Sequence, residues 1–283
     1  MPAVFPPALA PLVDLLRCPT CSADLHPAPG ALLCPVGHTF NIARQGYVSL
    51  LTGARATSGD DAAMAQARSR FLASGKYAAI GRTLAHLTAA ALPEHGKVVD
   101  AGCGTGYYLA GVLDQLPEAR GLGLDASVRA LRSAARAHER AAAASWDVFR
   151  PFPLVDQAAD VVLNVFAPRN PAEFHRVLRR SGRLIVVRPT THQHMVELRS
   201  SVPAMVTIDP HKERRLHQAL NPLFEATETQ HIEYTSSLTT QEAVDLVGMT
   251  PSARHLHDDD LLQSGVLPHR VTVSVLVTAY RPR

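Results

Sequence analysis

The chain has 283 residues, of which 46% are hydrophobic and 19% charged, and its mean hydropathy is +0.01. This composition is that of a globular protein, and no apolar stretch has the length of a membrane span. Residues 1–11 lack the basic and apolar regions of a secretory signal, so we expect a cytoplasmic protein without membrane association. The net charge of +3 permits a nucleic-acid partner but does not require one.

A group of cysteines near the N-terminus has the spacing of a metal site. Cys18 and Cys21 form a Cys-x-x-Cys pair, Cys34 follows after twelve residues, and His38 comes four residues later. Two such knuckles supply the four ligands of a tetrahedral zinc ion, a closed and therefore structural arrangement. The alternative is a chance group of buried cysteines with a surface histidine. The clustering argues against it, and we predict a zinc-binding ribbon over residues 1–50.

The remainder, residues 51–283, is predicted to be one domain that begins with a helical lead-in over residues 51–92. After the lead-in, strands alternate with helices, which indicates a doubly wound parallel sheet. The expected strands are 97–101, 121–124, 141–145, 159–164 and 183–188, and the expected helices are 107–116, 128–138 and 171–178. Two late alternating segments, 224–238 and 270–280, are expected as strands flanking helices near 240–247 and 258–264, with an antiparallel edge strand.

A glycine-rich turn follows the first of these strands. Gly102, Gly104 and Gly106 allow the backbone to turn sharply and to approach a ligand closely. The next helix offers free N–H groups to an anion. A dinucleotide enzyme would bind pyrophosphate here, but Asp100 at the strand end would repel it. The same carboxylate suits the ammonium group of S-adenosylmethionine (SAM), so the sign of the charge favours SAM.

Two further acids lie after the second and third strands. Asp125 comes about 20 residues after the loop, where an acid binds ribose hydroxyls. The alternative, a tight turn with a surface aspartate, would have to explain the whole arrangement by chance. Asp147 could reach the adenine or could be a solvated loop acid, and the sequence leaves this open. The predicted fold class is therefore α/β, a class I SAM-dependent methyltransferase Rossmann-like sheet with a small N-terminal zinc-ribbon module.

The segment from Asn164 to Asn170 follows a buried strand and should border the cofactor crevice. Nucleobase methyltransferases often combine a polar residue, an aromatic and a proline at this place. Asn164 could bind a base edge or the SAM amine, and Phe166 could stack on a splayed base or could belong to the core. Arg169 is a candidate contact to a phosphate or a base.

Several stretches together resemble the 23S rRNA (guanine-N1)-methyltransferase family of the RlmA type. Beside the ribbon and the cofactor loop, the resemblance rests on residues 37–40, 43–51, 59–61, 64, 67–68, 71–72, 75–77, 166–168 and 249–252. Residues 164–171 and 209–213 look most like the branch that confers resistance to macrolides of the tylosin and mycinamicin type. One departure is Ser181-Gly182, where family members often have Pro-Gly.

The resemblance implies more than the motifs do. It implies zinc on the four ligands named above and SAM contacts from Gly104, Thr105, Tyr77 and His194. It also implies methylation at N1 of a guanosine in the hairpin 35 loop of 23S rRNA, and a homodimer.

Methylation at N1 also requires the loss of a proton, and Asp60 or Asp61 could accept it, with Asn164 on the base edge. Two alternatives share parts of this pattern. The first is a small-molecule methyltransferase, which the zinc ribbon argues against. The second is a non-catalytic RNA-binding adaptor, which the intact Asp100 and Asp125 argue against.

Overall fold

A computed structural model describes residues 5–53, 59–202, 205, 212–254, 256 and 267–283. The helix expected over 258–264 and residues 209–211 of the macrolide-branch segment lie outside these residues. No helix within the described ranges combines the length and the apolar character that a membrane span requires.

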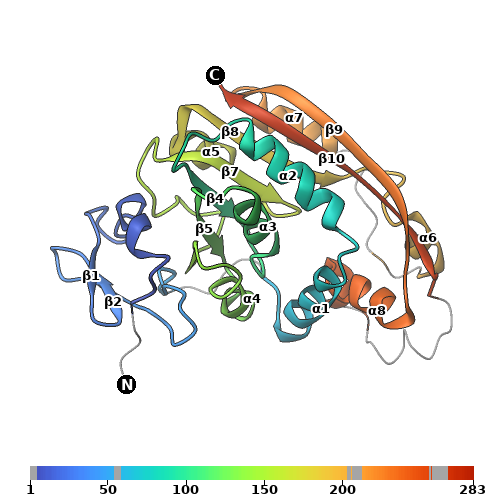
Figure 1. Cartoon of the computed structure of the whole chain (residues 1–283), viewed down its shortest axis with the longest axis horizontal. Coiled ribbons are helices and arrows are strands. Elements are labelled where there is room, and N and C mark those ends of the chain that lie inside the picture. Colours follow the sequence, from blue (N-terminus) through green and yellow to red (C-terminus); the bar gives the residue numbers. More distant parts are fainter. Residues whose placement is uncertain (1–4, 54–58, 203–204, 206–211, 255, 257–266) are drawn as a thin grey trace.

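The described chain folds around a seven-stranded sheet in the order β6-β5-β4-β7-β8-β10-β9 (Figure 1). The five strands from β6 to β8 are parallel, and β10 is antiparallel to both neighbours, as expected for the late strand pair. The strands are β4 (Lys97–Ala101), β5 (Arg120–Asp125), β6 (Ala141–Ser145), β7 (Ala159–Val165), β8 (Leu178–Pro189), β9 (Phe224–Ser237) and β10 (Arg270–Pro282).

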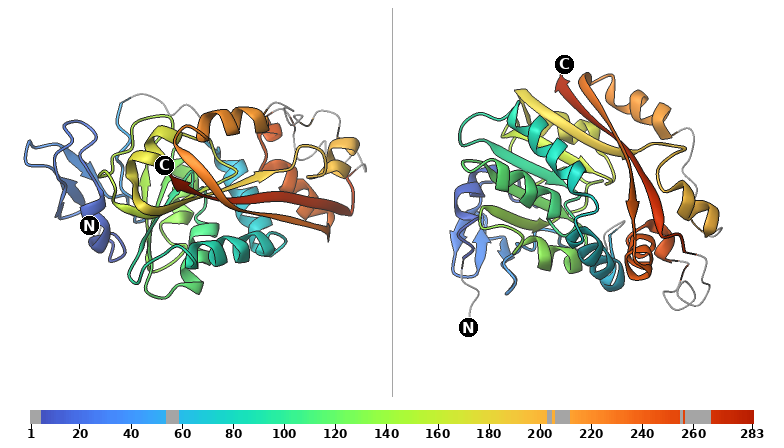
Figure 2. Two further views of the ribbon diagram at one scale, coloured as in Figure 1. Left: turned by 90° about the horizontal axis from the view of Figure 1, so that it is seen from above. Right: turned by 45° about the vertical axis from the view of Figure 1, so that its right-hand side comes forward.

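Helices cover both faces of this sheet (Figure 2). Successive side chains of a strand point to opposite faces, so Val98 belongs to one buried cluster with α2 and α3, whereas Val99 belongs to another with α5 and α7. The helices are α1 (Ala62–Ala73), α2 (Ala78–Ala89), α3 (Tyr107–Gln115), α4 (Val128–Ala134), α5 (Pro171–Val177), α6 (Val196–Ser201), α7 (Lys212–Leu220) and α8 (Thr240–Gly248), with 3-10 turns η1 (Ala10–Leu15) and η2 (Pro251–Arg254).

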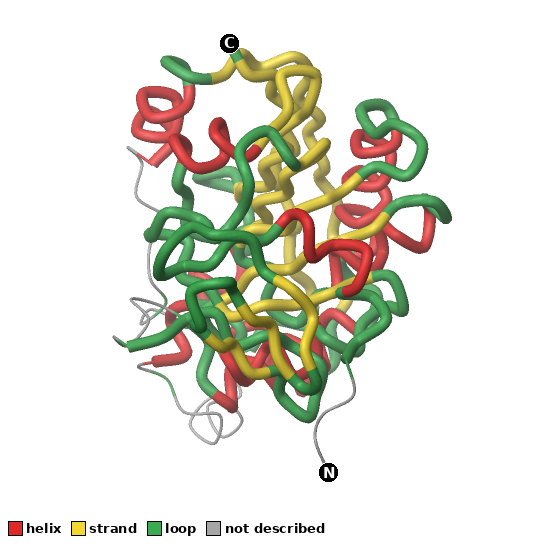
Figure 3. Tube along the Cα trace, turned by 90° about the vertical axis from the view of Figure 1, so that its left-hand side faces the viewer, coloured by secondary structure: helices red, strands yellow, loops and turns green. Residues whose placement is uncertain are grey.

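The N-terminal ribbon is attached to the main sheet through a shared core. It contains the antiparallel strands β1 (His26–Ala28), β2 (Ala31–Leu33) and β3 (Thr39–Asn41) (Figure 3). Leu12, Leu16 and Leu32 lie in the same buried cluster as Val99 of the main sheet. The Val48 amide donates to the Ala143 carbonyl at 2.9 Å, which ties the end of the ribbon to β6. The domain boundary after residue 50 stays a prediction.

Three local features differ from the expectations. Helix α4 is capped by Ser127 as expected but ends at Ala134 instead of residue 138, although no glycine or proline marks the stop. Strand β8 begins at Leu178, directly after α5, and its pairing with β7 shifts register before it resumes at Arg183. Helices α6 and α7 were not expected, because each is short and buries few side chains.

Candidate functional site

A cavity of about 660 Å³ lies at the carboxyl ends of β4, β5 and β7. Its volume is within the range of about 300–1,000 Å³ that is usual for ligand sites. The glycine-rich loop, the start of α1, the loop after β7 and residues 249–252 surround it. Its position is the crevice in which open α/β sheets bind their ligands.

The glycine-rich loop packs closely against the loop that follows β7. Gly102 has φ +86°, and a Cβ atom there would lie 2.4 Å from Cβ of Ala167. Gly106 has φ +81° and caps α3. Larger residues would strain the backbone at both positions and would separate the two loops at the first. The close packing of the two loops therefore requires glycine at position 102.

Asp100 is the most unusual charged group of the cavity wall. Its side chain is 1% exposed, and Oδ1 has no hydrogen-bond partner among the described residues. Burial, and secondarily the carboxylate of Asp125, raises the pKa of Asp100 to about 8. A cation placed beside this carboxylate would stabilise its charged form. The residues thus fit the ammonium group of SAM.

Asp125 is held in place by two backbone amides. Oδ2 accepts from the amide of Gly104 at 2.8 Å, and Oδ1 accepts from that of Ser127 at 2.7 Å. A carboxylate has about four acceptor positions, so two remain for ribose hydroxyls. Burial raises the pKa of Asp125, and the two amide contacts oppose this rise.

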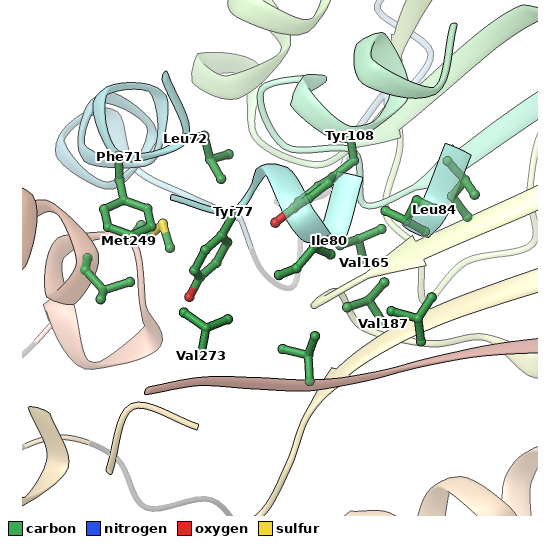
Figure 4. Packing of buried hydrophobic residues seen from close by; sticks show 14 of the residues in the cluster. Phe71, Leu72, Tyr77, Ile80, Leu84, Tyr108, Val165, Val187, Met249 and Val273 are labelled. Atoms are coloured by element: carbon green, nitrogen blue, oxygen red, sulfur yellow. The ribbon is translucent and has the colours of Figure 1, made fainter. Parts of the chain in front are cut away.

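Four rings form what we call the aromatic wall, which consists of Tyr77, Tyr108, Phe166 and His194. The Phe166 ring lies 6.2 Å from Tyr77, 6.4 Å from Tyr108 and 6.2 Å from His194, the last in a stacked orientation. Figure 4 shows Tyr77 between Phe71 and Val273. The hydroxyls of Tyr77 and Tyr108 are buried without a partner in the described chain. Phe166 has φ +53°, a rare conformation for a bulky residue and one that often marks a functional site.

His194 presents a neutral ring to the cavity. Its Nδ1 accepts from the amide of Ser274 at 3.2 Å, so the proton of a neutral imidazole resides on Nε2. Burial, and then the positive charge of Arg199, lowers the pKa of His194 to about 4. His194 therefore offers a hydrogen-bond donor without adding a positive charge.

Asp60 lines the cavity, but both carboxylate oxygens are held by Arg68, the shorter contact being 2.6 Å. Arg68 also donates to the carbonyl of Met249 at 2.8 Å, which links the middle of α1 to the end of α8. This ion pair holds the carboxylate of Asp60 in the cavity wall. Its role as a proton acceptor stays a prediction.

Of the residues expected at the site, ten lie on the cavity wall and four do not. Those on the wall are Asp60, Tyr77, Asp100, Gly102, Gly104, Thr105, Asp125, Phe166, Arg169 and His194. Asp61 instead caps α1, where its Oδ1 accepts from the amide of Met64 at 2.9 Å. Behind the wall, Gly106 begins α3. Asn164 donates its amide to the carbonyls of Pro168 at 2.8 Å and Ala101 at 3.1 Å. Asp147 is 1% exposed and accepts from the amide of Phe149, so it is not a solvated acid.

The predicted metal ligands form one cluster in the ribbon. Their donor atoms all lie within 4.8 Å of one another. Sγ of Cys21 and Sγ of Cys34 are 3.7 Å apart, and Nδ1 of His38 lies 3.6 Å from Sγ of Cys18 and 3.2 Å from Sγ of Cys34. Usual zinc–ligand bond lengths place tetrahedral donors about 3.3–3.8 Å apart. The four side chains thus fit a zinc ion.

Comparisons with known proteins agree with both parts of the chain. A family described as "RlmA, N-terminal" matches residues 16–55, and one described as "Methyltransferase domain" matches residues 98–186. A 23S rRNA (guanine(748)-N(1))-methyltransferase of Streptomyces fradiae is 43% identical over 276 residues, which cover 96% of this chain and 98% of the relative.

The chain belongs to the 23S rRNA (guanine-N1)-methyltransferase family. A Micromonospora griseorubida protein, provisionally named as such an enzyme, is 45% identical over 293 residues, again 96% of this chain and 98% of the relative. The expected resemblance is therefore confirmed.

Solved structures support the fold of the methyltransferase part. An Anabaena variabilis protein, provisionally described as a methyltransferase from an antibiotic biosynthesis pathway, has a TM-score of 0.52 at 14% identity and covers 71% of this chain and 96% of its own. At this identity the likeness concerns the fold alone. The methyltransferase has the predicted class I SAM-dependent fold, and its Cys3His cluster is the zinc site of the ribbon.

Two parts of the methyltransferase's cavity carry no sequence motif. Tyr108 belongs to the aromatic wall, and two adjacent tyrosines directly after the glycine-rich loop could have indicated it. The pairing of Arg68 with Asp60 also went unnoticed, although an i, i+8 spacing across a helix start offers little signal.

Proposed function

We propose that this methyltransferase transfers the methyl group of SAM to N1 of a guanosine in 23S rRNA. The observation that carries the proposal is the cavity itself. In its wall, beside Phe166, lies the buried carboxylate of Asp100, whose Oδ1 has no hydrogen-bond partner within the described ranges. It occurs in a chain that is 43% identical, over nearly its full length, to an enzyme named for this reaction.

The residues divide into a cofactor side and a base side. On the cofactor side, Asp100 would bind the ammonium group and Asp125 the ribose, while the amides after Gly104 would receive the carboxylate. When bound, SAM supplies an activated methyl group. The protein mainly aligns the nucleophile, because in-line attack requires N1 within about 3–3.5 Å of the methyl carbon.

On the base side, Phe166 would stack on the splayed guanine, since sequence-specific RNA recognition usually acts on unpaired bases. Tyr77 and His194 would lie between the cofactor side and the base side of the cavity. Asn164 would act by holding the loop that carries Phe166, because its amide bonds the carbonyl of Pro168. Asp147 would support the loop of Val148, which lines the cavity.

The target would be a guanosine in the hairpin 35 loop, the counterpart of guanine 748 in the name of the Streptomyces relative. Methylation there would confer resistance to macrolides of the tylosin and mycinamicin type, as the resemblance of residues 164–171 suggests. We further propose a cytoplasmic homodimer, in which the ribbons help to hold the folded RNA hairpin.

The test is methyl transfer from labelled SAM to unmodified 23S rRNA, followed by primer extension. Methylation at N1 blocks base pairing, so we expect one stop in the hairpin 35 loop, absent from RNA in which that guanosine is replaced by adenosine. The Asp100→Asn variant should show weaker SAM binding and a weaker stop. SAM binding without transfer to the rRNA would contradict the proposal and would favour a small-molecule substrate.

A further inference from the structure

The arginines of the cavity wall differ in what holds them. Arg68 is paired with Asp60 at 2.6 Å, and the guanidinium of Arg199 donates to the carbonyls of Thr191 and His192. Arg169, by contrast, has no hydrogen bond or ion pair from its side chain to any residue in the described part of the chain. Its donors are therefore available to a ligand in the cavity.

Arg169 is also in an unfavourable environment for a free cation. Its Nε is buried without a hydrogen-bond partner among the described groups. Burial lowers the pKa of Arg169. The nearby Tyr280 opposes this change, and the positive charge of Arg188 adds to it. A partly buried cation whose Nε lacks an acceptor reduces stability, and an acceptor that arrives with the substrate would remove this cost.

The backbone on both sides of Arg169 is fixed. The preceding carbonyl, of Pro168, accepts the amide of Asn164 at 2.8 Å. The next residue, Asn170, caps α5 and donates its amide to the carbonyl of Val148 at 3.0 Å. Three residues before Arg169, the ring of Phe166 lines the same cavity. The guanidinium thus emerges from a rigid loop beside the proposed stacking platform, as a preorganised binding group requires.

We propose that Arg169 binds the target guanine through O6 and N7, which leaves N1 free to accept the methyl group. The inference rests on the proposed function. Guanine is the base that presents two acceptors on this edge, and the planar guanidinium fork matches them, whereas adenine presents one donor and one acceptor there.

The same contact assists the reaction. As the N1–C bond forms, the methyl–sulfur bond breaks and sulfur keeps its electron pair, while the N1 proton passes to solvent. Loss of that proton places negative charge on O6. A guanidinium in a water-poor site stabilises such charge strongly, so Arg169 would make N1 easier to deprotonate as well as select guanine.

The test uses the full-length, zinc-loaded protein with an RNA hairpin that carries the target. For Arg169→Gln we expect turnover about 10²- to 10³-fold lower, with KM for RNA and SAM affinity within about threefold. Its pH–rate profile should move to higher pH, because N1 would lose its proton less easily. The control is Arg120→Gln, at the opposite end of β5 from the cavity, which should be fully active.

A second arm removes the acceptor instead of the donor. Replacing the target with 7-deazaguanosine deletes N7 and should slow the wild-type enzyme about 5- to 100-fold. It should not slow Arg169→Gln any further. If the variant fails to fold, as judged by SAM binding and thermal melting, this arm decides alone, and an unaffected wild-type rate would overturn the proposal.

Other outcomes are equally decisive. A higher KM for RNA, an unchanged turnover and a weaker salt dependence in Arg169→Gln would indicate a phosphate contact and overturn the base contact. An active wild type with an equally active Arg169→Gln contradicts the inference only. A wild type that transfers nothing to the RNA contradicts the proposed function as well.

Discussion

The metal cluster and the cofactor cavity differ in whether their polar atoms have partners. In the cluster, donor atoms of Cys18, Cys21, Cys34 and His38 face one another at 3.2–3.7 Å. In the cavity, Oδ1 of Asp100 and the hydroxyls of Tyr77 and Tyr108 are buried without partners among the described residues. The closed site contributes stability, whereas the open site sacrifices stability to have polar atoms ready for ligands.

The largest effect should come from removing one ligand of the zinc site. Cys34→Ser removes a zinc ligand, and we expect a melting temperature more than about 10 °C lower, since structural zinc contributes many kcal/mol to folding. The loss should spread to the main sheet, because Leu32 and Val99 share one buried cluster. Zinc content and melting measure both effects. Cys103→Ala, outside the cluster, should keep its zinc, and a zinc-loaded, unchanged Cys34→Ser would refute the assignment.

The next effect concerns the base side of the open site. Phe166→Ala should lower kcat/KM for the RNA about 5- to 100-fold, because base–aromatic stacking contributes about 1–3 kcal/mol. SAM affinity should change little, since Asp100 and Asp125 remain in place. Methyl transfer and calorimetry measure the two quantities. Unchanged turnover would show that Phe166 does not stack on the target base.

A smaller effect follows from the pKa of about 8 at Asp100. Without ligand this carboxyl is mostly protonated at pH 7, so binding of a cation must release close to one proton. SAM affinity should therefore rise by nearly tenfold between pH 6 and pH 7. Calorimetry in buffers of different ionisation enthalpy counts the protons. Asp100→Asn should release none, and a wild type that also releases none would contradict the assignment.

The last prediction concerns the stability that the folded protein loses when Asp100 ionises. The pKa of Asp100 is higher in the folded protein than its ordinary value of 3.8, so its ionisation reduces stability progressively as the pH rises from about 4 to about 8. Asp100→Asn cannot ionise and should melt at least several degrees higher than the ligand-free wild type at pH 8. The difference should vanish near pH 4. An equal difference at both pH values would point to altered packing instead.

The residues that could be predicted from sequence are those whose partners are close along the chain. The four zinc ligands lie within 21 positions, and Asp125 contacts Gly104 across a separation of 21. The strand–helix alternation likewise placed the parallel strands, because each buries a continuous apolar run. Local spacing was enough to predict the parallel part of the sheet, the ribbon and the glycine-rich loop with Asp100 and Asp125.

The remainder depends on contacts between distant segments. Arg68 meets Met249 across 181 positions, and Asn164 meets Ala101 across 63. No motif encodes these pairings, so the role of Asn164 behind the cavity wall could not be predicted. Helix α7 could not be predicted for a different reason. It buries only Leu216 and Leu220 among its described side chains, too few to establish a helical period.

The most direct measurement identifies the methylated nucleoside itself. The zinc-loaded protein is incubated with SAM and unmodified 23S rRNA, the RNA is digested to nucleosides, and the products are separated by mass spectrometry against standards. The account predicts N1-methylguanosine at close to one per RNA molecule. Methylation of another guanine atom, of the ribose or of a different base would contradict it.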